Sequence, residues 1–183
     1  YIDGGIIPVA LALEEMGITR YGNTSSLFKK SPVDNLDLKT YTNTMTTGSI
    51  PAKYIMIVGD PKLSPRSNKN SDLQALTSEK NSNGDIIKVV LISQAGSEGI
   101  DLKNIRQIHI LEPWYNMSRI EQIIGRGVRN CSHKELPFEK RNVQIFLYGS
   151  YIDNQDEEAV DLYIYRLAET KAIQIGKINR ILK

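Results

Sequence analysis

The sequence predicts a single α/β domain with a central, mainly parallel sheet and helices on both faces. Four apolar runs of strand length alternate with segments of helical pattern, at 53–59, 86–93, 106–111 and 143–148. The run at 53–59 lacks polar alternation, which is typical of a strand that is buried on both faces. Parallel neighbours need a long crossover, usually a helix, so this alternation favours a parallel sheet over an antiparallel one.

Length and composition agree with one globular domain over residues 1–183. The chain is 40% hydrophobic and 24% charged, and its net charge of +2 is too small to indicate a nucleic-acid binder by bulk charge. Any anion-binding surface must therefore be local. The single cysteine, Cys131, excludes an internal disulfide and suits a reducing, intracellular compartment. No apolar run reaches the length that crosses a membrane.

The first part of the chain combines a helix with a long polar segment. A buried helix is expected over 6–16, with Pro8 in its first turn and Gly17 as its stop. A short strand is expected at 18–21. Residues 23–49 are rich in Ser, Thr, Asn and Lys and hold no apolar period, so they are predicted to form a loop or insertion.

Two further helices are expected after the first strand run. A short one is predicted over about 70–76, following a break at 65–69. A long closing helix is predicted over 155–183, with the acidic residues at 156–158 in its first turn and basic residues near its end, which matches the helix dipole. Gly176 is a candidate kink in this helix.

The loop at 93–101 follows a predicted buried strand, where open α/β sheets bind ligands. Gly96 and Gly99 would let backbone N–H groups approach an anion such as phosphate, and Asp101 could accept a hydrogen bond from a ribose hydroxyl. The alternative is an ordinary glycine-rich turn that ends in a helix cap. Taken alone, this loop favours the turn.

The segment 118–129 predicts an amphipathic helix with an unusual polar face. Helical spacing places Gln122, Arg126 and Arg129 on one face, with Arg119 beside them. The opposite face carries apolar residues, namely Ile120, Ile123, Ile124 and Val128. The arginine strip would suit a polyanion, whereas the alternative is a solvated face on an ordinary surface helix.

Two glycines and a tryptophan bear on this choice. Gly125 and Gly127 would each cost about 1 kcal/mol inside a helix, which indicates either close backbone approach or an early helix end. An end near Gly125 would leave Arg126 and Arg129 on a turn rather than on a regular helical face. Trp114, the only tryptophan, lies between the loop and the helix and is a candidate for packing under the helix, although a lone aromatic residue is more often simple core packing.

Together, the loop and the helix resemble motifs V and VI of superfamily 2 helicases, which lie in the second, C-terminal RecA-like domain of those proteins. Residues 93–102 are most similar to the Snf2-like branch. Residues 112–116 with 121–133 resemble helicase-type ATPases of large nucleocytoplasmic DNA viruses, such as the poxvirus early-transcription-factor small subunit. The resemblance covers most of the chain and is weakest in 23–49.

The resemblance implies roles for individual residues. Arg126 and Arg129 would be arginine fingers on the γ-phosphate of ATP, and Gln122 would orient them or contact the nucleotide. Asp101 would lie near the ribose or couple to the fingers, with Gly99 beside the nucleotide. The nucleic-acid phosphates would be contacted by the rest of the loop, namely Ser93, Gln94, Gly96 and Ser97.

The sequence lacks two parts that ATP hydrolysis needs. It contains no Gly-x-x-x-x-Gly-Lys-Ser/Thr loop, and no Asp-Glu pair at the end of a predicted strand that could serve as the magnesium motif. ATP and Mg²⁺ are therefore expected to be held mainly by an N-terminal RecA-like lobe of the same polypeptide, and this chain alone is expected to be inactive. The abrupt start at Tyr1 and the absent strand before Gly4 likewise suggest a piece of a longer protein.

The implied parent is a helicase or translocase acting on DNA or RNA, with viral transcription machinery as a partner and the host cytoplasm and virion as locations. The alternative is a non-catalytic RecA-like scaffold that docks a transcription or packaging partner. Cys131 and His133 could suggest a metal site, but two ligands without a second pair favour an incidental arrangement, so no metal site is predicted in this chain.

Overall fold

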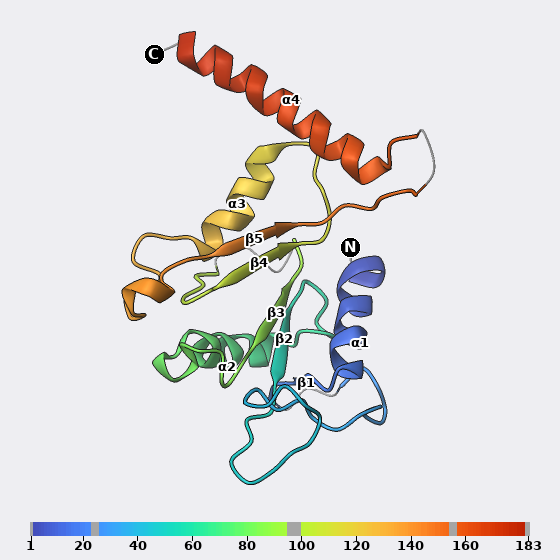
Figure 1. The fold of residues 1–183 in the computed structure, drawn as a ribbon, viewed down its shortest axis with the longest axis vertical. Helices are drawn as coiled ribbons and strands as arrows, with labels where there is room; N and C mark the ends of the chain where they lie inside the picture. Colours follow the sequence, from blue (N-terminus) through green and yellow to red (C-terminus); the bar gives the residue numbers. More distant parts are fainter. Residues whose placement is uncertain (1, 23–25, 95–99, 154–156, 182–183) are drawn as a thin grey trace. The chain divides into compact units, whose positions relative to one another are not determined.

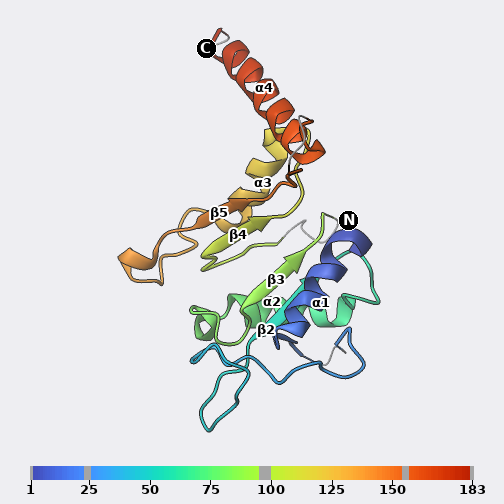
Figure 2. The ribbon, with the colours of Figure 1, turned by 45° about the vertical axis from the view of Figure 1, so that its right-hand side comes forward.

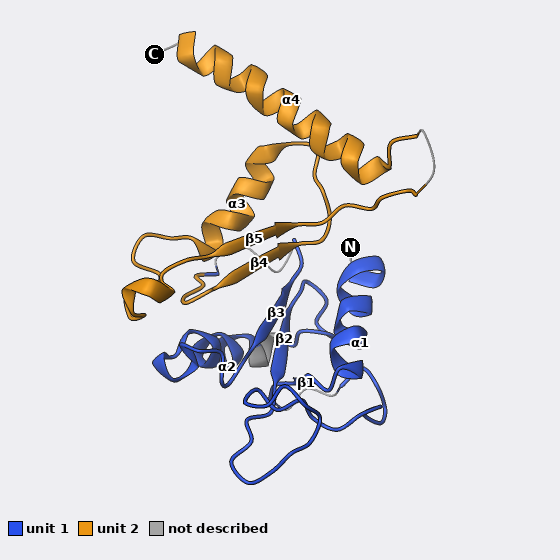
Figure 3. Cartoon of the chain, in the orientation of Figure 1, with its two compact units in different colours: residues 1–100 blue, residues 101–183 orange. Residues whose placement is uncertain are grey.

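The protein consists of two compact units with parallel strands and packed helices. The structure is a computed structural model that describes residues 2–22, 26–94, 100–153 and 157–181. Unit 1 is Tyr1–Ile100 and unit 2 is Asp101–Lys183 (Figure 1, Figure 3). The predicted α/β class with parallel pairing is confirmed. The assignment of residues 1–183 to one domain stays a prediction.

Unit 1 is built on a three-stranded parallel sheet. The strands are β1 (Thr19–Arg20), β2 (Lys53–Ile57) and β3 (Val89–Ile92), in the order β1-β2-β3. Tyr54 of β2 pairs with Val89, and Ile57 pairs with Ile92. Four consecutive residues of β2, from Tyr54 to Ile57, are buried, as expected for an apolar run in the centre of a sheet.

Helix α1 (Ile7–Glu15) follows a π-helical turn, Ile2–Ile6, and packs on one face of this sheet. Ala10 joins Tyr54 and Met56 in the hydrophobic core. The predicted stop at Gly17 is confirmed: its φ is +84°, and a Cβ there would overlap the Asp34 carbonyl oxygen. Only glycine therefore fits at this helix end.

Helix α2 (Arg66–Thr77) begins earlier than predicted. Its N-cap is Pro65, so the helix already begins within the expected break at 65–69. After it, Asn81 closes a tight turn by accepting from the backbone N–H groups of Ile86 and Ile87, both at 2.9 Å. Figure 1 and Figure 2 show α1 and α2 on opposite sides of β2 and β3.

The described part of the polar segment, residues 26–49, contains neither a helix nor a strand. Asp37, which is buried, forms an isolated bridge with Pro51 and accepts hydrogen bonds from the N–H groups of Ile50 at 2.8 Å and Lys39 at 3.2 Å. These bonds lower the pKa of the Asp37 carboxyl to about 2, the Ile50 N–H contributing most. A buried carboxylate thus organises this part of the segment.

A second carboxylate ties the same segment to the core. Buried Glu14 of α1 accepts from the N–H groups of Leu27 and Phe28, both at 2.9 Å, and from the Tyr54 hydroxyl at 2.7 Å. Burial, with this hydrogen bond, raises the pKa of Tyr54. The segment is therefore held by specific polar contacts to α1 and β2, and also by Leu27, Leu36 and Leu38, which pack against the hydrophobic core.

Unit 2 contains a two-stranded parallel sheet and two helices. Strands β4 (Gln107–Ile110) and β5 (Gln144–Leu147) pair in the register His109 to Phe146. Helix α3 (Met117–Gly127) packs on β4, and helix α4 (Val160–Ile181) packs on α3. Between α3 and β5 lies a 3-10 turn, Phe138–Lys140.

The predicted start of the closing helix at residue 155 is wrong. Helix α4 starts at Val160, so Glu157 and Glu158 precede it, while Asp156 lies outside the described residues. Asp161 is the acidic residue of the first turn, and its carboxylate accepts from the Ser150 N–H and hydroxyl groups. The helix continues through Gly176. None of the helices in the described ranges is long and apolar enough to cross a membrane.

Candidate functional site

Helix α3 carries the predicted arginine motif and is positioned at both ends. At its start, the Asn116 side chain accepts from the Arg119 N–H at 3.2 Å, which caps the helix. Its buried residues are Ile120 and Gly127. The predicted apolar face is therefore only partly correct, because Val128 lies just beyond the helix and its side chain is exposed.

The prediction that the helix ends near Gly125 is wrong. Helix α3 continues to Gly127, so Arg126 lies in its last turn and Arg129 lies beyond its end. The glycines explain why: a Cβ on Gly127 would stand 2.9 Å from Ile108 Cδ1 and 3.3 Å from Ile105 Cγ2, whereas a Cβ on Gly125 would meet nothing within 4 Å. Close approach of β4 and the preceding residues therefore explains why a glycine stands at position 127. At position 125 no neighbouring atom requires a glycine.

Gln122 and Arg126 share one face of α3, because they are one helical turn apart. Gln122 is exposed and Arg126 is half-buried. Within the described part of the chain, the Arg126 guanidinium forms no hydrogen bond or ion pair. Its planar donor fork is therefore available to an anion that approaches this end of the helix.

Arg129 is joined to the glycine-rich loop by an ion pair. Its Nη1 lies 3.1 Å from Asp101 Oδ1, and the side chains are 46% and 63% exposed. The structure thus brings together two of the predicted site residues, one from each motif. An exposed pair of this kind contributes at most about 1 kcal/mol to stability, so it can open at little cost.

The turn that carries Arg129 is fastened by residues to which the sequence assigned no role. Ser132 donates from its N–H at 3.1 Å and from its hydroxyl at 2.9 Å to the Arg129 carbonyl. His133 contacts the Ser132 hydroxyl through Nδ1 at 2.8 Å and the Ile105 carbonyl through Nε2 at 2.6 Å. A Ser-His pair directly after an arginine motif is the only signal that the sequence offered for this support.

These contacts also bear on the metal question at Cys131 and His133. Both ring nitrogens of His133 are engaged within the chain, and Cys131 has a positive φ of 63°. In the ranges that the structure covers, no three His, Cys, Asp or Glu side chains form a group that could hold a metal ion.

Arg119, expected beside the anion-binding strip, has a different neighbour. Its Cζ lies 3.8 Å from the centre of the Trp114 ring, which in turn makes an edge contact with Tyr115 at 6.1 Å. This cation–π stack places Trp114 against the first turn of α3, in agreement with the packing proposed from the sequence.

The residues predicted to contact nucleic acid fall in two classes. Ser93 and Gln94 follow β3 in unit 1, and the Ser93 N–H donates to the Ile57 carbonyl at 3.1 Å. Gly96, Ser97 and Gly99 lie outside the described residues. Their proposed contacts therefore stay predictions.

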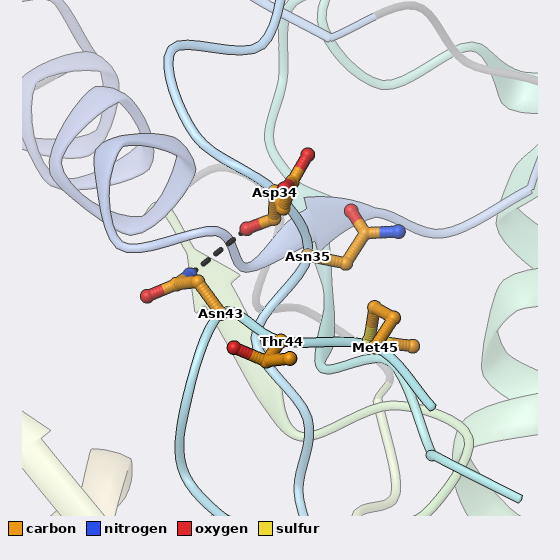
Figure 4. A pocket seen from close by; sticks show the side chains of 5 residues that line it. All are labelled: Asp34, Asn35, Asn43, Thr44 and Met45. Atoms are coloured by element: carbon orange, nitrogen blue, oxygen red, sulfur yellow. Dashed lines mark hydrogen bonds between the residues drawn. The ribbon is translucent and has the colours of Figure 1, made fainter. Parts of the chain in front are cut away.

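A pocket of about 430 Å³ lies in the polar segment of unit 1 (Figure 4). Its lining is mainly polar and contains none of the predicted site residues: Asp34, Asn35, Asn43, Thr44 and Met45. Asn43 donates to the Asp34 carbonyl at 2.8 Å and to the Met16 carbonyl at 3.0 Å. Its amide thus bridges the segment to the end of α1, which is a structural role.

Comparison with known proteins places the motif residues in a recognised family. Residues 50–131 match the helicase conserved C-terminal domain, and this range includes both the loop at 93–101 and helix α3. It begins after the polar segment and ends before β5 and α4.

Individual relatives are viral. The chain is 44% identical over 102 residues to a protein of Acanthamoeba polyphaga mimivirus named as an ATP-dependent RNA helicase, a match covering 55% of this chain. It is 34% identical over 143 residues, 74% of the chain, to the termination factor NPH-I homolog of African swine fever virus. It is 39% identical over 114 residues, 61% of the chain, to a protein named as a helicase in Invertebrate iridescent virus 3.

The matched segments make up 23%, 19% and 12% of those three proteins, so the chain spans less than a quarter of the length of these curated relatives. The resemblance to helicases of large DNA viruses that the sequence indicated is confirmed. Residues 50–131 are therefore similar to the helicase conserved C-terminal domain, and the relatives that the chain matches are proteins of large DNA viruses.

Proposed function

We propose that the chain is the C-terminal motor lobe of an ATP-dependent nucleic-acid helicase or translocase, in which Arg126 and Arg129 act on the γ-phosphate of ATP. The observation that carries the proposal is the Asp101–Arg129 ion pair, since it joins the two helicase motifs at the residues expected to work together. The viral relatives named as helicases support the same activity.

The two arginines suit phosphoryl transfer in different ways. Arg126 is fixed on the last turn of α3 and has no partner among the described residues, so it is preorganised to receive an anion. Planar guanidinium groups stabilise charge that develops on a transferred phosphoryl group, and such fingers contribute about 10³ to 10⁵ in rate. Gln122, one turn earlier on the same face, would hold the nucleotide or the attacking water in line.

Arg129 would exchange one anion for another. In the structure its guanidinium pairs with the exposed Asp101 carboxylate, which competes with phosphate for the same donors. Binding of a phosphate would release Asp101 to accept a hydrogen bond elsewhere, for instance from the ribose. The conformation of the glycine-rich loop, which ends at Asp101, would in this way depend on whether nucleotide is bound to Arg129.

Residues for the rest of the ATP site must come from elsewhere in the polypeptide. The sequence has no phosphate-binding Walker loop, and the described side chains offer no carboxylate cluster for Mg²⁺. We infer that an N-terminal RecA-like lobe holds ATP and Mg²⁺, and that the loop at 93–99 contacts nucleic-acid phosphates. Because one relative is named as a termination factor, viral transcription is the proposed setting.

The test is the ATPase activity of the full-length protein, measured with single-stranded DNA, duplex DNA and RNA side by side. Arg126→Ala and Arg129→Ala are each expected to lower nucleic-acid-stimulated turnover about 100-fold or more, while the affinity for ATP changes much less. Arg166→Ala is the matched control, because Arg166 is an exposed residue of α4 that pairs with Glu158, before the helix, and belongs to neither motif.

Wild-type turnover in both arginine variants would rule out the finger assignment. It would favour the alternative that residues 1–183 form a non-catalytic scaffold within the full-length protein. An equal loss in the Arg166 variant would show that the assay reports general destabilisation. The nucleic acid that gives the greatest stimulation would identify the substrate class.

A further inference from the structure

The far half of α4 presents an apolar stripe that nothing in the described structure covers. Helix α4 runs for 22 residues, but its buried residues, Ile164 and Ala168, both lie in the half that packs on α3. From Glu169 to Ile181 every side chain is exposed apart from Ala172, which is half-buried. Figure 1 and Figure 2 both show this half extending beyond α3, β4 and β5.

The exposed stripe continues the face by which α4 already packs. Ile164, Ala168, Ile175 and Ile178 follow one another at intervals of four, seven and three residues, so they lie on one side of the helix. Ile175 and Ile178 are each 57% exposed. A packing surface for a helix thus extends past the end of the helix that it packs against.

The charged residues in this half of α4 are nearly all positive. Residues 171–183 contain four cations and no Asp or Glu. One cation, Lys171, lies within the stripe, between Ala168 and Ile175 in the same periodic pattern. Its Nζ donates to the Tyr115 carbonyl at 3.4 Å. A partner that covers the stripe must therefore accept a positive charge in its interface.

We propose that Lys171, Ile175 and Ile178 form the docking face for an acidic amphipathic helix of a protein partner. The continuity with the α3 interface identifies a helix as the occupant, and the absence of Asp and Glu from the sequence 171–183 favours one that carries carboxylates, at least one of them opposite Lys171. A second copy of the chain is disfavoured, because it would bring two acid-free segments together.

The proposal can be tested with a synthetic helical peptide of three heptads. The acidic probe has leucine at its core positions and glutamate beside them, and the matched peptide has lysine in place of glutamate. Fluorescence anisotropy with the full-length protein is expected to show binding of the acidic peptide at least tenfold tighter than of the basic one. Equal affinity, or no detectable binding of the acidic peptide, would overturn the proposal.

Variants locate the site. Ile175→Asp is expected to weaken binding of the acidic peptide at least tenfold, whereas Ile173→Asp is expected to leave it unchanged, because Ile173 is similarly exposed, at 53%, but lies on the opposite side of the helix. Lys171→Glu is expected to weaken the acidic peptide and to strengthen the basic one. Circular dichroism of each variant checks that α4 stays folded.

Two other ligands serve as competing outcomes. A basic apolar helix can also lie on an anionic membrane surface or along nucleic acid. Loss of binding to phosphatidylserine vesicles or to duplex DNA in the Ile175 variant, without any binding of the acidic peptide, would reject the protein-helix occupant. A similar effect of the Ile173 and Ile175 substitutions would reject the stripe as the docking face.

Discussion

Asp37 shows how a single buried carboxylate can order a segment that has no helix or strand. Its side chain accepts two backbone N–H groups and the Thr40 hydroxyl, and it belongs to the stretch between α1 and β2. The composition of 23–49 predicted a loop, but could not reveal which of its polar residues would be buried. Only the folded chain brings Ile50 and Lys39 to the same carboxylate oxygen.

This carboxylate makes the stability of the fold dependent on pH. The folded-state pKa of about 2 is below the ordinary value of 3.8, so the ionised form stabilises the fold above that ordinary value. This contribution is lost as the pH falls from about 4 towards 2. We therefore expect Asp37→Asn to lower the free energy of unfolding at pH 7, by an amount that shrinks as the pH approaches 3.

Thermal or denaturant unfolding over this pH range measures the effect. Asp85→Asn is a suitable control, because Asp85 is exposed and its side chain forms no hydrogen bond with the residues that the structure describes. A difference between wild type and the Asp37 variant that stayed constant with pH would contradict the role given to this carboxylate.

At the scale of the element, α3 shows what a sequence pattern can and cannot decide. The existence of the helix and the common face of Gln122 and Arg126 followed from periodicity alone. Its end did not, because Gly125 and Gly127 look equivalent in sequence. What separates them is the distant strand β4, whose Ile108 touches Gly127 and leaves Gly125 open.

The two glycines should therefore respond differently to the same substitution. Gly125→Ala is expected to raise the free energy of unfolding by about 1 kcal/mol, since alanine favours the helix and meets no neighbour. Gly127→Ala is expected to gain less or to destabilise, because its Cβ would press on Ile108 and Ile105. Denaturant unfolding of both variants makes the comparison, and equal gains would show that β4 does not restrict Gly127.

The start of α4 is a second helix boundary that the sequence pattern did not predict. Three acidic residues before Val160 made an early start attractive by the helix dipole. In the structure Glu158 forms an ion pair with Arg166 instead, with Arg166 Nη2 2.5 Å from Glu158 Oε2. The acidic residue in the first turn of α4 is Asp161. Charge patterns therefore indicated that a helix lay here, whereas the side-chain partners decided where it begins.

At the scale of the whole molecule, the parallel α/β class and the helicase resemblance could both be predicted from sequence. Apolar runs of strand length and the order of two motifs are local signals, which can be read from the sequence without coordinates. The coupling of Asp101 to Arg129, and the support of Arg129 by Ser132 and His133, depend on contacts across the fold. No spacing rule gives such contacts.

The division of labour between lobes leads to a prediction for the chain by itself. Because residues 1–183 lack a Walker loop and a magnesium motif, the isolated chain is expected to show no ATP hydrolysis above background, with or without nucleic acid. A coupled assay of phosphate release measures this, with the full-length protein as the positive control. Turnover by the isolated chain that depended on Arg126 would show that the site is complete without a second lobe.

The Trp114–Arg119 stack has a consequence for how this molecule can be watched. Trp114 is the only indole in the chain, and it lies against the first turn of the helix that carries Gln122 and Arg126. Its emission therefore arises from one place, and a change in the distance to the Arg119 guanidinium alters the surroundings of the ring. The helix carries an intrinsic optical probe, by which stopped-flow fluorescence can follow its movement without any attached dye.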